Sequence, residues 1–112
     1  MQPEILKYIL DLESVIREIE EIKVRTQNDF DRFLADIVLQ RAIERDLEII
    51  GEAVRKIIDL QPNFPITSAR NIIGLRNIIS HAYDTVEPEL IWAIIQKDIP
   101  VLSENLKRIR QK

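Results

Sequence analysis

The chain has 112 residues, 46% of them hydrophobic and 31% charged, with a formal net charge of −3. This length allows one domain with a single core, and the absence of cysteine excludes disulfides and thiolate metal sites. No apolar run is long enough to span a bilayer, and no signal-peptide pattern opens the chain. The acidic net charge does not indicate nucleic-acid binding by the surface as a whole, and we expect no DNA or membrane partner. We therefore expect a single cytoplasmic domain over residues 1–112.

The composition favours helices, because isoleucine, leucine, glutamate and arginine dominate and only two glycines and five prolines interrupt them. The first predicted helix follows Pro3, a residue suited to a first helical turn, and runs to about Lys23. Its apolar positions step by four and three residues, which predicts one buried stripe. These positions are Ile5, Ile9, Leu12, Ile16 and Ile19.

The second predicted helix is long: Thr26 or Asn28 is the expected cap, and the helix continues to about Leu60. One apolar stripe runs along it, and further apolar side chains widen that stripe. The stripe is Ile43, Leu47, Ile50, Val54 and Ile57, and the widening residues are Phe33, Ile37, Leu39, Ile49, Ala53 and Ile58. A helix that is apolar over so much of its circumference is central to a bundle or shared with a partner chain, and we expect both.

Two more helices complete the chain. Thr67 and Ser68 can cap the third, at about residues 68–82, and Pro88 begins the fourth, which runs to about Arg110. The apolar positions of the fourth helix again step by four and three residues. They are Ile91, Ile95, Ile99, Leu102, Leu106 and Ile109.

Pro100 lies inside the fourth helix and predicts a kink, because it lacks a backbone donor and its ring crowds the preceding turn. No stretch alternates convincingly as a strand. The predicted fold is therefore an all-α, antiparallel up-and-down four-helix bundle with short connections.

The most informative stretch is a polar run near the end of the third helix. It holds the single histidine, His81, which can move protons near neutral pH, and Arg76, which can neutralise a phosphate. On a helix Asn77 lies one turn from His81, Ser80 one turn from Arg76, and Tyr83 two turns from Arg76. The run therefore predicts a polar stripe on an amphipathic helix.

Each of these residues also has an ordinary structural interpretation. A lone histidine near a helix end often only satisfies carbonyl groups, and a helical arginine commonly pairs with a glutamate, here Glu48 or Glu52. A tyrosine just past a helix is commonly a core-edge residue. The basic tail at 107–112 is explained by the dipole of its own helix. Spacing alone leaves both interpretations open.

The sequence Gly74-Leu75-Arg76-Asn77-Ile78-Ile79-Ser80-His81-Ala82-Tyr83 resembles the motif of the HEPN superfamily. It is more closely similar to the HepT branch, whose motif is arginine, four residues, histidine, one residue, tyrosine. Arg76, His81 and Tyr83 match all three positions. The flanking segments at 50–53 and 92–102 agree as well, so the resemblance covers essentially the whole chain.

HepT-like proteins are homodimeric ribonuclease toxins paired with a minimal nucleotidyltransferase antitoxin of the MntA type. The resemblance implies that Arg76 and His81 of both chains form the catalytic site in a cleft at the dimer interface, with Asn77 orienting the histidine or the phosphate. It also implies that Tyr83 is the residue that the antitoxin adenylylates. Glu52 matches a recurrent glutamate of the family and is an expected supporting residue.

The residue types fit metal-free RNA cleavage, which needs a base for the 2′-hydroxyl, an acid for the leaving 5′-oxygen and a cation for the crowded phosphorane. One histidine cannot easily be base and acid at once, but a two-fold dimer brings two copies of His81 and Arg76 to one cleft. We expect a 2′,3′-cyclic phosphate product, Ser80 as a further supporting residue, and no metal or cofactor.

Two other functions are weighed against this one. A non-catalytic HEPN protein that binds a minimal nucleotidyltransferase and helps present its substrate fits the negative net charge but leaves the motif unexplained. A metal-dependent hydrolase using Glu48, Glu52 and His81 is disfavoured, because the paired Glu-x-x-His arrangement of di-iron bundles is absent and Ile78 stands where its glutamate belongs.

Overall fold

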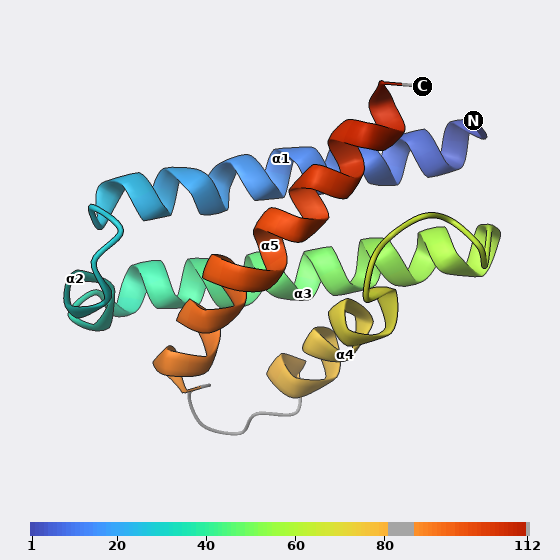
Figure 1. The fold of residues 1–112 in the computed structure, drawn as a ribbon. Helices are drawn as coiled ribbons and strands as arrows, with labels where there is room; N and C mark the ends of the chain where they lie inside the picture. The colour runs from blue at the N-terminus through green and yellow to red at the C-terminus, as the bar shows by residue number, and fades with distance from the viewer. Residues whose placement is uncertain (81–86, 112) are drawn as a thin grey trace.

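The computed structural model describes residues 1–80 and 87–111, and for residues 76–78 and 80 it describes the backbone alone. These described residues form five helices and no strand (Figure 1). The helices are α1 (Pro3–Arg25), α2 (Phe30–Leu34), α3 (Ile37–Leu60), α4 (Ala69–Ser80) and α5 (Pro88–Arg110). None of them combines the length and the apolarity needed to cross a bilayer.

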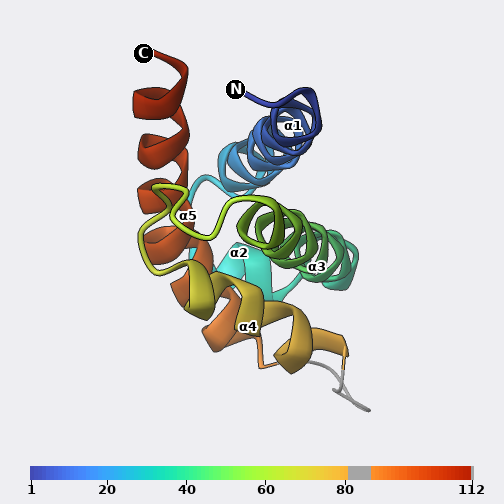
Figure 2. The ribbon, with the colours of Figure 1, turned by 90° about the vertical axis from the view of Figure 1, so that its right-hand side faces the viewer.

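Helix α3 is the centre of the bundle and contacts each of the other four helices. Helix α1 runs antiparallel to α3 along one side, α4 lies on the opposite side of α3, and α5 crosses α1 and α3 obliquely (Figure 1, Figure 2). The prediction of an all-helical bundle built around its second long helix is therefore confirmed.

The three predicted apolar stripes form the core. All of their residues on α1, α3 and α5 are buried except Ile109, which is half-buried. Phe64 and Ile66 from the α3–α4 loop, with Ile72 and Leu75 from α4, extend the core. Each fully buried isoleucine or leucine contributes about 1.5–3 kcal/mol to folding, so the stripes dominate the stability of the bundle.

The second predicted helix is wrong at its start, because the chain breaks into α2 and α3 at Ala35 and Asp36. The Asp36 carboxylate accepts a hydrogen bond from the backbone N–H of Leu39 at 3.1 Å and thereby caps α3. The side-chain amide of Gln40 donates to the carbonyls of Phe33 and Leu34, both at 3.0 Å, and satisfies the end of α2.

The predicted caps of this helix are also corrected. Asp29, not Thr26 or Asn28, caps α2, since its carboxylate accepts from the Asp31 N–H at 3.1 Å. Thr26 instead ends α1: its hydroxyl lies 3.0 Å from the Ile22 carbonyl oxygen, to which it donates. Short polar side chains serve either end of a helix, so residue type alone did not identify which end each one serves.

Helix α2 is fastened to the start of α5 by aromatic packing. The Trp92 ring lies 5.1 Å from Phe33 and 5.9 Å from Phe30 between ring centroids, and the Phe30 contact is edge-on. The Gln96 amide donates to the Asn28 side-chain oxygen at 2.7 Å. These contacts close the end of the bundle at which α2 and α5 begin.

Helix α4 begins where the sequence predicts, since the Ser68 carbonyl accepts from the N–H groups of Asn71 and Ile72. Its last described residue is Ser80, and the predicted end at position 82 lies outside the described residues. Helix α5 has the predicted bounds and continues through Pro100, where the expected kink stays a prediction.

Candidate functional site

The backbone of α4 carries three of the predicted site residues. Arg76, Asn77 and Ser80 lie toward the C-terminal end of this helix, with Arg76 and Ser80 about one turn apart. His81 and Tyr83 lie outside the described residues. The structure therefore places the start of the motif on α4 and leaves the predicted roles of all five residues as predictions.

Helix α4 packs along α3, and two of its described side chains are buried in the core. Ile72 and Leu75 are buried, at 3% and 8% exposure, while Arg70 and Asn71 are exposed. Leu75 directly precedes Arg76, so the residue that packs α4 into the core is the neighbour of the predicted catalytic arginine. This packing determines which side of α4 faces the bundle.

A two-point hydrogen-bonded bridge fastens the beginning of α4 to α5. The Thr67 backbone N–H donates to the Asn105 side-chain oxygen at 2.8 Å, and the Asn105 amide donates to the Thr67 hydroxyl at 3.3 Å. Asn105 is 8% exposed, and Ser68 between the bridge and the helix has a positive φ of 57°. A buried amide that satisfies both its oxygen and its nitrogen fixes this junction, which sequence reasoning missed because the partners are 38 residues apart.

Glu52 lies on α3, where its carboxylate pairs with Arg55 at 2.6 Å. The hydrogen bond from Arg55 to Glu52 raises the pKa of the Arg55 guanidinium. Glu52 also lines a groove of about 440 Å³, together with Tyr8 and Lys56, and the described residues that line this groove belong to α1 and α3. The supporting role predicted for Glu52 stays a prediction.

Tyr8 lines that α1–α3 groove and has two lysine side chains near its ring. The ammonium groups of Lys7 and Lys56 lie 4.9 Å and 5.7 Å from the centre of its ring, within the range of cation–π attraction. A hydrogen bond to Asp11 raises the pKa of Lys7. The groove is thus a mixed surface, with cations and carboxylates side by side around one aromatic ring.

Asp46 is a buried acid that the sequence reasoning did not single out. It is 4% exposed on α3, and its Oδ2 atom has no hydrogen-bond partner among the described residues. Burial, followed by the charge of Glu18, raises the pKa of Asp46 to about 7, while Arg45 lowers it. The spacing carried a signal of this burial, since Asp46 lies three residues after Ile43 and four before Ile50 of the buried stripe.

Within the part of the chain that the structure describes, no three histidine, cysteine, aspartate or glutamate side chains gather closely enough to hold a metal ion. Glu48 and Glu52 both line the α1–α3 groove, whereas His81, the third residue of the disfavoured metal site, lies outside the described residues.

Comparison with known proteins agrees with the motif. The family described as "Ribonuclease HepT-like" matches residues 12–109. A protein of Caldanaerobacter subterraneus subsp. tengcongensis named "Putative RNase" is 37% identical over 103 residues, which cover 90% of this chain and 92% of that protein. The "Probable ribonuclease HepT" of Thermococcus cleftensis is 33% identical over 105 residues, covering 93% and 94% of the two chains.

No solved structure is significantly similar to the chain. The family match nevertheless extends from the first half of α1 to the end of α5, and the similar proteins are covered over nearly their whole length. The chain therefore belongs to the HepT-like ribonuclease family of the HEPN superfamily.

Proposed function

We propose that this protein is the toxin of a toxin–antitoxin pair and an endoribonuclease that needs no metal. Two copies of the chain form its active cleft, and each contributes Arg76 and His81. The observation that carries the proposal is the family match over residues 12–109, which includes these two residues at the HepT spacing. Support also comes from the fold, because Arg76 stands on a helix that Leu75 packs into the core.

The chemistry is an internal transfer of the RNA phosphate. One His81 takes the proton from the 2′-hydroxyl, the 2′-oxygen bonds to phosphorus, and the bond from phosphorus to the 5′-oxygen breaks. The second His81 gives its proton to the leaving 5′-oxygen, so the products are a 2′,3′-cyclic phosphate and a 5′-hydroxyl. The two Arg76 guanidinium groups stabilise the negative charge that builds on the phosphorane. Asn77 holds the histidine or the phosphate in place.

The attachment of α4 supports this assignment, because electrostatic catalysis requires groups that are already in position. Leu75 packs against the core beside Arg76, and the Asn105–Thr67 bridge fixes the other end of the helix. A helix held at its start and along one face presents Arg76 with little reorganisation when the substrate arrives.

The test is cleavage of single-stranded RNA in the presence of a chelator. We expect the wild-type protein to produce 2′,3′-cyclic phosphate ends and His81→Ala to lower the rate by about 10²–10⁴-fold. Light scattering should give the mass of a dimer. Cleavage that survives His81→Ala, or that needs a divalent metal, contradicts the proposal, and an inert protein that binds a nucleotidyltransferase tightly selects the non-catalytic alternative.

Adenylylation of Tyr83 is the proposed control of this activity. A minimal nucleotidyltransferase of the MntA type transfers AMP from ATP to the Tyr83 oxygen and releases pyrophosphate. The added group is bulky and negatively charged, so it blocks the cleft and competes for Arg76. Cleavage by unmodified protein, AMP-modified protein and Tyr83→Phe is the measurement. Equal rates for the first two contradict this control, and Tyr83→Phe should stay active in the presence of the partner.

A further inference from the structure

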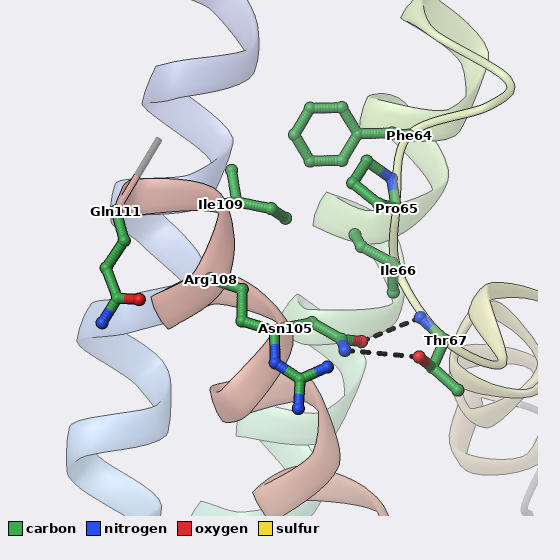
Figure 3. A pocket seen from close by; sticks show the side chains of 8 residues that line it. All are labelled: Phe64, Pro65, Ile66, Thr67, Asn105, Arg108, Ile109 and Gln111. Atoms are coloured by element: carbon green, nitrogen blue, oxygen red, sulfur yellow. Dashed lines mark hydrogen bonds between the residues drawn. The ribbon is translucent and has the colours of Figure 1, made fainter.

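An open pocket of about 770 Å³ lies between the α3–α4 loop and the end of α5 (Figure 3). Ile109 points from α5 toward Phe64 and Ile66 of the loop, so these residues form apolar walls. Arg108 extends beside Asn105 on the α5 side of the pocket. Ligand pockets commonly combine apolar walls with a few polar groups in this way.

A second pocket, of about 200 Å³, continues this hollow along α4. It is lined by Asn71, Ile72 and Leu75 of α4 and by Lys97 of α5. The two pockets adjoin at Thr67, which lines both, and together we call them the α4–α5 groove. The groove therefore runs from the end of α5 to Leu75, the residue immediately before Arg76.

The α4–α5 groove carries two cations on one side of α5. Lys97 and Arg108 are eleven residues apart, which is close to three helical turns and about 16 Å along the axis, so both project from nearly the same side. Arg108 is 72% exposed, and its contact with Glu104 is long, at 3.9 Å. Lys97 makes no ion pair with any residue that the structure describes.

The charge of the groove differs from that of the protein. Its described lining residues include two cations and one acid, Asp98, whereas the whole chain has a net charge of −3. An exposed ion pair such as Arg108 with Glu104 stabilises little, so the guanidinium can exchange this partner for a phosphate. Two cations beside two acids make the groove less negative than the protein as a whole, and this surface repels a polyanionic ligand less than the rest does.

The remaining lining suits nucleotides. The half-buried Ile109 and the exposed Pro65 offer apolar surface to a base, and the side chains of Asn71 and Gln111 offer amide groups to base edges or sugars. Asn105 is already bridged to Thr67, so the loop wall is preformed.

We propose that the α4–α5 groove binds single-stranded RNA and leads it to the motif on α4, with Arg108 and Lys97 each binding a backbone phosphate. This inference rests on the proposed ribonuclease function. A separation of about 16 Å between the cations requires a strand several nucleotides long, since a single nucleotide cannot contact both. An acidic peptide is the competing occupant, but the groove extends along α4, the helix whose backbone carries Arg76, and this favours the substrate.

Binding and cleavage are measured separately so that the two proposals can fail independently. Binding uses a fluorescently labelled oligouridylate that spans the groove, with His81→Ala as the background so that the strand stays intact. We expect Arg108→Glu and Lys97→Glu each to weaken binding by about ten-fold. Loss of each phosphate contact should also reduce the slope of log affinity against log salt by about 0.7.

The control is Arg25→Glu, which reverses one exposed charge at the end of α1, outside both pockets of the groove. It should match the parent protein in binding. With His81 intact, the groove variants should raise KM for long RNA, leave kcat unchanged and cleave the dinucleotide uridylyl-uridine normally. Circular dichroism checks that each variant is folded.

The outcomes distinguish the proposals. If the groove variants bind oligouridylate as tightly as Arg25→Glu does, the groove inference is wrong, even when His81→Ala abolishes cleavage. If the groove variants lose binding but wild-type protein does not cleave, the groove inference holds and the ribonuclease proposal fails. If they keep RNA affinity but lose affinity for an acidic peptide, the groove is a protein-docking site and the inference is overturned.

Discussion

Helices α3 and α4 lie side by side but differ in the residues that they bury. Helix α3 has nine buried residues and contacts all the other helices, whereas Ile72 and Leu75 are the buried residues among the described side chains of α4. The predicted chemistry lies on α4 and directly after it. Under the proposed function, fold and activity are encoded in separate helices, so substitutions in α3 should change stability and substitutions in α4 should change RNA cleavage.

The largest expected effect is a loss of RNA cleavage caused by a substitution in α4. Arg76→Ala should lower RNA cleavage by about 10²–10³-fold, because the phosphorane loses its cation, and should change the free energy of unfolding little. The matched control is Arg70→Ala, which removes an exposed arginine from the first turn of the same helix and should cleave RNA normally. For both variants, cleavage rates are measured with labelled RNA, and the free energy of unfolding is measured in urea. Equal cleavage by Arg76→Ala and Arg70→Ala contradicts the assignment of the activity to Arg76.

The complementary experiment is made on α3. Leu47→Ala should lower the free energy of unfolding by about 2–5 kcal/mol, because it opens a cavity at a fully buried position. The protein that remains folded should cleave RNA at a rate close to that of the wild type. Val38, which is 70% exposed on the same helix, is the control, since Val38→Ala should change stability by about 0.5 kcal/mol or less. A large effect of Val38→Ala indicates that a partner chain covers this face.

Asp46 makes the stability of the α3 region depend on pH. Its pKa is about 7 in the folded protein and near the ordinary 3.8 in the unfolded chain. Between these values the folded protein holds a proton that the unfolded chain has released, so the free energy of unfolding falls as pH rises from 3.8 to about 7 and then levels off.

The variant Asp46→Asn should remove this pH dependence, which amounts to about 2–4 kcal/mol across the window. Urea unfolding at several pH values from 4 to 8 measures it, since both values of the Asp46 pKa fall near or inside this range. The readout is the change with pH of the difference between variant and wild type, so a constant offset from the new amide does not matter. A difference that stays constant with pH contradicts the assignment.

The smallest effect concerns Gly74 in the middle of α4. A Cβ atom built there meets no atom of the described residues within 4 Å, so Gly74→Ala should stabilise the helix by about 0.5–1 kcal/mol. Thermal unfolding measures this gain. Destabilisation instead, together with a shift toward monomer in light scattering, shows that a second copy approaches the α4 backbone at this position.

Much of the fold could be predicted because periodic apolar positions report directly on burial. Ile50, Leu102 and their neighbours in the three stripes are buried as expected. The break before α3 was missed because it depends on two particular side chains, Asp36 as a cap and Gln40 as a donor to α2. Periodicity does not reveal hydrogen bonds of this kind.

The site was predicted differently, from the resemblance of a short motif and not from physical spacing. Spacing alone left Arg76 and His81 with ordinary structural interpretations, because single polar residues on a helix have many uses. The Asn105–Thr67 bridge could not be read from spacing, since it depends on how distant helices pack. Long-range contacts of this kind have no periodic signature.

The Asn105–Thr67 bridge also affects the order in which the helices can pack during synthesis. Proteins are synthesised from the N-terminus, and Asn105 follows Thr67 by 38 residues. A growing chain therefore contains Thr67 before Asn105 has been made, and the bridge forms only after the second half of α5 has left the ribosome. The start of α4, the helix that carries Arg76 on its backbone, is thus fastened to α5 after α1 and α3 have already been synthesised.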